Sequence, residues 1–420
     1  MPPATPRRRP RPRRLLSLSA AAMTVLALTG GATAAGAAEQ ADAAGQSARS
    51  AAPRDVMLVG NGQGGTVSFI DPRTFENLGS FNTVPDLDQR IREMDPIERI
   101  GYETVNSIQG YRKLVDDMAM SPDGRTLYVS RGVLSDAVAF DIASGTMLWR
   151  YETEGFKADH AALSEDGSKF IVSATTADKA EVINTATGKL HTEFATGTYP
   201  HANDYSPDGS ILYNSSIGIT SMPKGLNGLK GKRQVVAVDA DTFKPLRTYD
   251  FEYGIRPAVF TADNKTMYAQ LSYLNGFVEY DLDRGEIKRT VEMPFSDKAA
   301  KMRADDYPQN SAHHGMAMNT AESKLCMAGT IDDYVAIVSR PGLETDGYVH
   351  YDTDALPYWT ATSPDGKHCF VSLSNKNEVS VVDYATAKEV ARIPTGHFPQ
   401  RERPGKLTAE ALEALDPSDG

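Results

Sequence analysis

The 420-residue sequence lacks the short motifs that identify a chemistry by themselves. It has no Gly-x-Ser-x-Gly nucleophile elbow, no His-Glu-x-x-His zinc motif and no phosphate-binding P-loop. Its only two cysteines do not form a Cys-x-x-Cys-His haem attachment motif. These absences exclude a c-type haem and the commonest hydrolase, zinc-protease and nucleotide-binding motifs as the basis of its function.

Basic residues are also fewer than acidic residues. The chain has 44 Lys and Arg against 55 Asp and Glu, which gives a formal net charge of −11. Residues 1–14 hold six of the arginines and no acid, so removal of an N-terminal signal would bring the charge to −17. Nucleic acid and anionic lipid both require basic surface. We therefore expect neither as a partner.

The N-terminus predicts export. The arginines of residues 1–14 precede an apolar run at 15–28 and small residues near Ala34 and Ala37, which is the pattern of a cleaved signal peptide over residues 1–38. The apolar run is too short for a permanent membrane anchor. Arg13-Arg14 fits a twin-arginine signal, and an ordinary secretory signal explains it equally well. Residues 39–54 read as a flexible leader, and we expect a secreted, extracellular or cell-envelope protein.

A repeated strand-and-turn signal sets the fold class. An apolar strand that ends in a polar turn occurs seven times, with the turns opening at Asp71, Asp141, Asn184, Asp239, Asp281, Ser339 and Asp383. Short strands and turns at a period of about 42 residues are typical of four-stranded propeller blades. The sequence predicts an all-β, seven-bladed β-propeller of antiparallel blades over residues 55–410, followed by a C-terminal tail at 411–420.

The repeats also carry a family resemblance. Pro200-His201, the turn Ser206-Pro207-Asp208-Gly209, the strand Leu127-Tyr128-Val129-Ser130 and the Asp-x-x-x-Gly turns resemble the YVTN/YncE-like seven-bladed propellers. These are exported relatives of the lactonase-type propellers, and the resemblance covers nearly all of residues 55–400. It implies the fold but no single function, since that superfamily includes enzymes, electron-transfer subunits and binding modules.

The ring is expected to close through the C-terminus. The first repeat lacks an innermost strand, and Thr395–Gln400 parallels the segment that leads into the inner strand at Pro200. We expect the C-terminal segment to supply the missing strand. Longer spacings place insertions at 82–115, 217–233 and 294–311, all on one face, with short helices expected within 86–111.

The two cysteines are not expected to pair. An even number of cysteines in an exported protein suggests a disulfide. However, the segments Lys324-Leu325-Cys326 and Lys367-His368-Cys369 occupy the same strand position in two successive repeats. Equivalent side chains face the same side of their own sheets, so the sequence favours two separate thiols.

Polar residues gather at the starts of the inner strands, close to the predicted axis. Each inner strand begins on the elaborated face, and five of the eight histidines lie at or beside this point, including His313 and His397. One residue from each blade is expected at the axis: Asp116 or Asp117, His160, His201, Arg256, His314, Tyr358 and Gln400. Trp359 lies beside Tyr358 and is a candidate stacking surface.

Three interpretations of this set stay open. His160, His201 and His314 suit a copper, iron or zinc ion with Asp116 or Asp117 nearby, although His160 needs a one-residue bulge to align. Without metal, a histidine with Asp117 suits general base catalysis, and Arg256 suits an anion. The third interpretation is structural, with Pro-His simply the way that this repeat begins.

The function predicted from the sequence is binding of a small polar or anionic ligand at a lidded axial site, with catalysis left open. Arg256, Tyr358, Trp359, Gln400 and Asp116 are the expected ligand contacts, and His160, His201, His314 and Asp117 the expected catalytic groups. One alternative is a metal-dependent oxidoreductase, hydrolase or lyase. The other is a scaffold whose inserted loops bind another exported protein.

Overall fold

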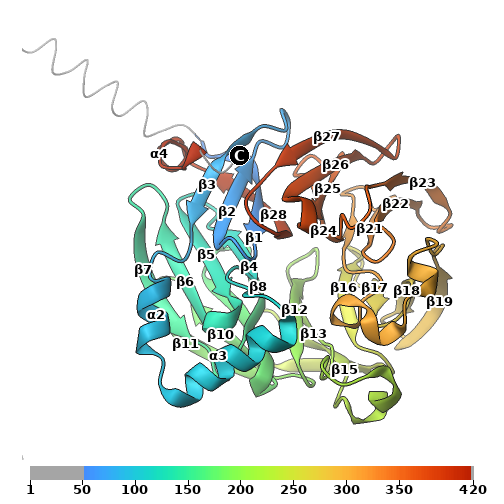
Figure 1. The fold of residues 1–420 in the computed structure, drawn as a ribbon, viewed down its shortest axis with the longest axis horizontal. Coiled ribbons are helices and arrows are strands. Elements are labelled where there is room, and N and C mark those ends of the chain that lie inside the picture. The colour runs from blue at the N-terminus through green and yellow to red at the C-terminus, as the bar shows by residue number, and fades with distance from the viewer. Residues whose placement is uncertain (1–51, 418–420) are drawn as a thin grey trace, which may run out of the picture. The chain divides into compact units, whose positions relative to one another are not determined.

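Seven four-stranded antiparallel sheets follow one another around a common centre (Figure 1). The computed structural model describes residues 52–417. The predicted signal peptide, nearly all of the predicted leader and the last three residues of the predicted tail lie outside this range. Within the described residues, each inner strand contacts the inner strands of the two neighbouring sheets, so the predicted seven-bladed propeller is confirmed.

Each blade has four strands, which run from the innermost strand at the axis to the outermost strand. The blades that begin the chain are β28 (Pro399–Leu407), β1 (Arg54–Asn61), β2 (Thr66–Ile70), β3 (Asn77–Asn82); β4 (Asp117–Met120), β5 (Thr126–Arg131), β6 (Asp136–Asp141), β7 (Thr146–Glu152); and β8 (Ala158–Leu163), β9 (Lys169–Ala174), β10 (Lys179–Asn184), β11 (Lys189–Ala195). The middle blade is β12 (Pro200–Tyr205), β13 (Ile211–Ser216), β14 (Gln234–Asp239), β15 (Pro245–Asp250).

The remaining blades repeat the same plan. They are β16 (Ile255–Phe260), β17 (Thr266–Leu271), β18 (Gly276–Asp281), β19 (Glu286–Glu292); β20 (Met316–Met318), β21 (Lys324–Gly329), β22 (Tyr334–Ser339), β23 (Thr345–His350); and β24 (Pro357–Thr362), β25 (His368–Leu373), β26 (Glu378–Asp383), β27 (Lys388–Pro394). Central strands such as β9 are buried on both faces because they pack between two neighbouring blades, whereas the outermost β7 alternates between exposed and half-buried positions.

The Ser-Pro-Asp-Gly turns join inner strands to second strands, as expected. In the turn at Ser206, the hydroxyl donates to Asp208 Oδ1 at 2.6 Å and accepts from the backbone N–H of Ile211 at 2.9 Å. Gly209 takes a φ of +72°, which a side chain would disfavour. The turn chemistry therefore explains why these repeats could be recognised in the sequence.

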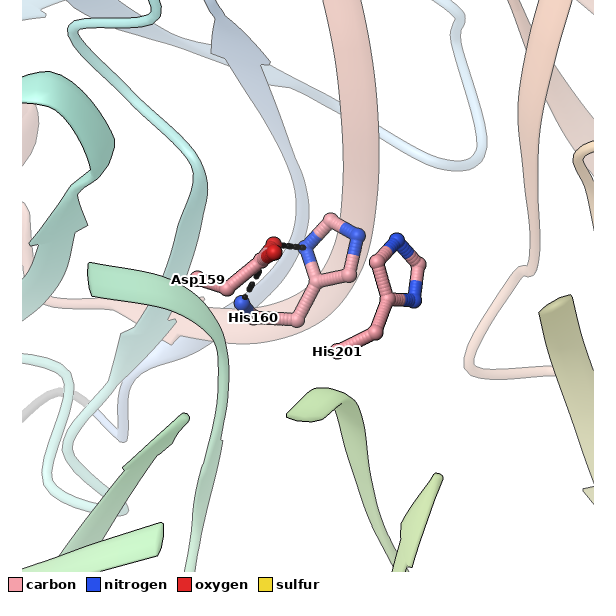
Figure 2. Close-up of side chains that lie close together, drawn as sticks. All are labelled: Asp159, His160 and His201. Carbon is pink, nitrogen blue, oxygen red and sulfur yellow. Dashed lines mark hydrogen bonds and ion pairs between the residues drawn. The ribbon is translucent and has the colours of Figure 1, made fainter. Parts of the chain in front are cut away.

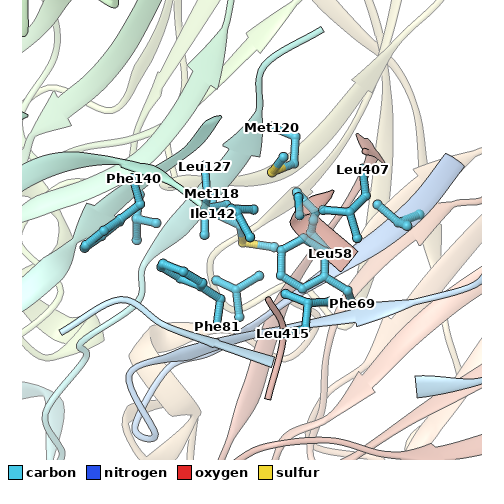
Figure 3. Close-up of a cluster of buried hydrophobic side chains, with 14 of the residues drawn as sticks. Leu58, Phe69, Phe81, Met118, Met120, Leu127, Phe140, Ile142, Leu407 and Leu415 are labelled. Atoms are coloured by element: carbon cyan, nitrogen blue, oxygen red, sulfur yellow. The ribbon is translucent and has the colours of Figure 1, made fainter. Parts of the chain in front are cut away.

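The C-terminal strand closes the ring, which confirms the prediction. Strand β28 pairs antiparallel with β1 along its whole length, for example Arg403 with Leu58. The chain continues into α4 (Ala409–Glu413), and Leu415 packs with Leu58 and Leu407 in the largest hydrophobic cluster (Figure 3). Closure thus joins the two ends of the described chain through backbone hydrogen bonds and a shared core.

The three insertions cover one face. The first forms α2 (Leu87–Glu93) and α3 (Pro96–Gln109), and Pro96 is the first residue of α3 rather than an interruption of it. Asp95 caps α3 by accepting from two backbone N–H groups, and Glu98 completes the capping box. The other insertions form short 3₁₀ turns at Lys224–Leu229, Ala299–Lys301, Ala304–Asp306 and Pro308–Asn310. None of the described helices is long and apolar enough to span a membrane.

The expectation that Cys326 and Cys369 stay apart is wrong, because the structure joins them in a disulfide with Cα atoms 6.5 Å apart. The error is one residue of register. Lys324 pairs with Ser339 in the same way that His368 pairs with Asp383, so Cys369 is equivalent to Leu325 and not to Cys326. Adjacent strand positions face opposite sides, and the two cysteines therefore meet between neighbouring blades.

This disulfide is expected to stabilise the fold. It closes a loop with a sequence separation of 43 residues, and its loss in a Cys326→Ala/Cys369→Ala variant should lower the free energy of unfolding by about 2–4 kcal/mol. Urea unfolding of oxidised wild type and variant measures the difference. Reduced wild type should resemble the variant, and equal midpoints for all three proteins would contradict the prediction.

Candidate functional site

Bulges at the axial ends of the inner strands shape the candidate site. Strands β8, β12, β16, β24 and β28 each carry one extra residue relative to the strand beside them. A bulge removes residues from the hydrogen-bonded ladder and re-aims their side chains. The bulge in β8 falls between Ala158 and Ala161 and contains His160, and the bulge in β12 falls between Pro200 and Ala202 and contains His201.

The predicted histidines come together. The ring of His201 lies 4.3 Å from that of His160 and 5.5 Å from that of His314, measured between centroids. Tyr358 stacks on His314 at 4.1 Å, and Trp359 lies 5.4 Å from His160. By contrast, His313 faces Tyr334, whose hydroxyl is 3.3 Å from its Nε2.

Burial favours the neutral form of all three clustered histidines. Burial is the largest cause that holds the pKa values of His160, His201 and His314 well below the usual range, and nearby Arg256, Arg401 or Lys113 lower them further. Nδ1 of His314 faces the carbonyl oxygen of Tyr358 at 3.3 Å, while its Nε2 has no hydrogen-bond partner. A neutral imidazole offers a lone pair to a metal ion or to a proton.

Three carboxylates surround one nitrogen of His160. Its Nδ1 lies 3.0 Å from Asp116, 3.9 Å from Asp117 and 3.9 Å from Asp159. Lys113 contacts Asp116 at 2.9 Å, and Lys157 contacts Asp159 at 2.7 Å. Burial and then Asp116 raise the pKa of Asp159, but Lys157, His201 and His160 together hold it below the usual range. The carboxylates of Asp116 and Asp159 are therefore each paired with a lysine.

Asp117 is already saturated with partners. It accepts from both Nε and Nη2 of Arg403 at 2.7 Å and from the backbone N–H of Ala161 at 2.9 Å. Arg401 reaches it at 2.8 Å. Burial alone would raise the pKa of Asp117, but the two arginines hold it below the usual range. This carboxylate has no lone pair left for proton transfer, so its geometry favours a positioning role over the predicted catalytic one.

Arg256 is a buried cation without a carboxylate. Its Nε donates to the Ser272 hydroxyl at 3.2 Å, and its Nη2 donates to the backbone carbonyl of Gln309. It forms no ion pair within the described part of the chain, and burial lowers its pKa to about 10. The guanidinium stays charged at neutral pH, and among the described residues no carboxylate contacts it to compensate that charge.

A small cavity lies beside these groups, under all three insertions. Its volume is about 60 Å³, room for a few water molecules. Ile108 of α3, Thr220 of the second insertion and Gln309 of the third form part of its wall. The titratable side chains that line it are Tyr111, Lys113, Lys157, Asp159, Tyr199, His201, Arg256, His314 and Tyr358.

The remaining predicted residues lie behind this wall. His160, Asp116 and Asp117 contact one another in the second layer. The ring of Trp359 stacks under the guanidinium of Arg401 at 3.5 Å. Gln400 donates to the carbonyl oxygen of Val115 at 3.3 Å. The structure thus brings the whole predicted set to the axis, but only His201, Arg256, His314 and Tyr358 of it line the cavity.

Sequence reasoning missed Lys113, Lys157, Asp159 and Arg401. Each lies within three residues of a predicted axial position, and this proximity in the sequence could have identified them. Lys113 precedes Asp116, Lys157 and Asp159 precede His160, and Arg401 follows Gln400. Choosing one residue per blade discarded these neighbours, because a regular strand would point alternate residues away from the axis.

Comparison with known proteins supports the fold only. No family model and no curated protein matches the sequence. A solved structure of hydrazine synthase from Kuenenia stuttgartiensis is similar, with a TM-score of 0.54 and 17% sequence identity, over 68% of this chain and 88% of that one. Because 1776 solved chains match this fold, such a likeness selects no particular activity.

The saturated Asp117 generates a stability prediction. Asp117→Asn leaves Arg401 and Arg403 without their shared charge in a buried setting, and we expect it to lower the free energy of unfolding by about 3–5 kcal/mol. Urea unfolding measures this loss, with Asp283→Asn on an exposed turn as the control. A variant as stable as the control would show that the cluster does not support the fold.

Lys230 generates a pH prediction. It connects the second insertion to Tyr273 at 2.6 Å and Asn310 at 2.8 Å, and burial followed by repulsion from Arg256 lowers its pKa to about 8. The unfolded chain, with the ordinary value near 10.5, binds more protons between these two pH values. Wild type should therefore gain stability relative to Lys230→Met as pH rises from about 8 toward 10.5. Thermal unfolding of both proteins across this range measures the gain, and a constant difference would contradict it.

Proposed function

We propose that this chain binds a small anion, a carboxylate or another oxyanion, in the axial cavity under the three insertions. The observation that carries the proposal is Arg256. A buried guanidinium with only neutral partners is costly, and an anionic ligand with two oxygens in one plane matches its donor geometry. His201, His314 and Tyr358 line the same cavity and can supply further hydrogen bonds.

The local charge also favours an anion, although the whole chain is acidic. Five basic side chains lie at the axis against three carboxylates that pair with them: Lys113, Lys157, Arg256, Arg401 and Arg403 against Asp116, Asp117 and Asp159. Burial raises the pKa values of Glu402 and Asp204, which weakens their negative contribution. A buried positive excess attracts an anion strongly, because a protein interior screens charge less than bulk water does.

The cavity volume limits the ligand. About 60 Å³ accommodates only a few non-hydrogen atoms, so we infer a ligand near the size of formate, acetate or a small oxyanion. A larger ligand requires the insertions to move. We further infer that binding takes place outside the cytoplasm, on the basis of the predicted signal at residues 1–38.

Exposed apolar side chains favour a second candidate function, a protein-binding scaffold. Ile97 and Ile100 of α3 are 68% and 67% exposed, and Leu229 of the second insertion and Phe295 of the third are 67% and 49% exposed. Exposed large apolar residues on inserted segments are typical of contact surfaces. Neither isoleucine lines the axial cavity, so the two functions are separable by mutation.

The anion proposal is tested by calorimetric titration of chelator-treated protein with formate, acetate, phosphate and sulfate. Wild type should bind at least one of them, and Arg256→Met should weaken that binding about tenfold to hundredfold, the value of a hydrogen bond to a charged group. Arg247→Met is the matched control, because Arg247 also donates to backbone carbonyls but lies on outer strand β15. No binding by wild type, or equal binding by both variants, would overturn the proposal.

A further inference from the structure

We infer that Asp159, His160 and His201 form a site for one divalent first-row transition-metal ion. Asp159 and His160 come from the bulge in β8, and His201 comes from the bulge in β12. One donor atom from each lies within 4.8 Å of the others, and the three residues are 0%, 1% and 4% exposed. Figure 2 shows the two imidazoles side by side, with the Asp159 carboxylate next to Nδ1 of His160.

Unsatisfied nitrogen atoms point to an occupant. Neither nitrogen of His160 makes a hydrogen bond, and Nδ1 of His201 also has no partner. Buried polar atoms are nearly always paired in folded proteins, so several unpaired imidazole nitrogens in one place require an explanation. A metal ion pairs with such nitrogens directly, because neutral imidazole is a common metal ligand.

The carboxylates around His160 point to a cation. Nδ1 of His160 has oxygens of Asp116, Asp117 and Asp159 within 3.9 Å, which is an arrangement that stabilises positive charge. Lys157 binds Oδ2 of Asp159 at 2.7 Å, whereas Oδ1 is the oxygen that faces the imidazole. The lysine thus orients the carboxylate as an outer partner. The inner oxygen accepts from the backbone N–H of His160 at 3.0 Å and keeps a second lone pair for the ion.

The donor set limits the choice of metal. Two imidazoles and one carboxylate suit zinc, copper, cobalt and iron and are poor ligands for calcium or magnesium, which prefer oxygen. Three protein ligands leave coordination positions open. Asp159 and His201 line the cavity that also contains Arg256, so an anion in that cavity can reach both the ion and the guanidinium. Such an ion is the precondition for the metal-dependent oxidoreductase, hydrolase or lyase chemistry expected from the sequence.

This set differs from the one expected from the sequence. His160 and His201 remain, Asp159 is added and His314 is left out, because its ring centroid lies 5.5 Å from that of His201 and its Nδ1 faces a backbone carbonyl. The difference gives the experiment a matched control. His314 is a buried axial histidine like the other two, but its replacement should leave the ion in place.

The test uses the metal alone. Chelator-treated mature protein is titrated with Zn²⁺ by calorimetry and with Co²⁺ by visible spectroscopy, and we expect one ion per chain with d–d bands of a four- or five-coordinate site. His160→Gln, His201→Gln and Asp159→Asn should each weaken binding by more than about tenfold. His314→Gln and the exposed His191→Gln should bind as wild type does.

Several results would overturn the inference. If wild type takes up no stoichiometric ion, the inference is wrong whatever the variants show. This outcome keeps the test valid even if a variant fails to fold. If His314→Gln and His201→Gln lose metal binding equally, the ligands are the three histidines expected from the sequence and not Asp159, His160 and His201. Unchanged binding in all three ligand variants assigns the ion to another place. Anion binding is measured without metal, so failure of that proposal and failure of this one are separate results.

Discussion

The carboxylate of Asp117 is the contact on which the axial region depends. It accepts from Arg403 of closing strand β28 and from the backbone N–H of Ala161 in β8, and it forms an ion pair with Arg401 of β28. Asp117 itself begins β4. One buried side chain thereby joins three neighbouring blades, including the blade that connects the two ends of the described chain. Removing one partner of such a cluster leaves buried charge unpaired, so these three blades are fixed relative to one another.

The same contact explains how the functional groups are presented. The N–H of Ala161 is bound by Asp117 at the end of the bulge that contains Asp159 and His160, so the bulge is held open by a specific acceptor. Bulged strands give up ladder hydrogen bonds at the axis, a loss that packing in the rest of each blade offsets. As a result, side chains that a regular strand would point away from the axis converge on one cavity. We interpret the bulged inner strands as a scaffold in which irregular strand ends preorganise a polar site.

The sequence was sufficient for the features that repeat and insufficient for those that depend on register. The blade count, closure by the C-terminal segment and the single elaborated face followed from turns such as Ser206–Gly209 and from spacing, both local properties. The disulfide was missed because one residue separates the true from the apparent equivalence of Cys326 and Cys369. Lys113, Lys157 and Asp159 were missed because strand periodicity does not reveal a bulge.

The acidic character of the whole chain and the positive excess at its axis are compatible. Charges on the exposed surface are screened within about 8–10 Å at physiological salt, whereas Arg256 and the axial lysine Lys113 are buried and act at much shorter range. Surface acidity therefore disfavours extended polyanions, such as nucleic acid, without opposing a small anion that enters the cavity. Neutral imidazoles on the same wall avoid adding repulsion to a metal ion, and an ion there would increase the attraction for the anion. The two proposed ligands thus reinforce one another through a shared wall. His201 belongs to both sites, whereas Arg256 serves only the anion and Asp159 and His160 serve only the ion.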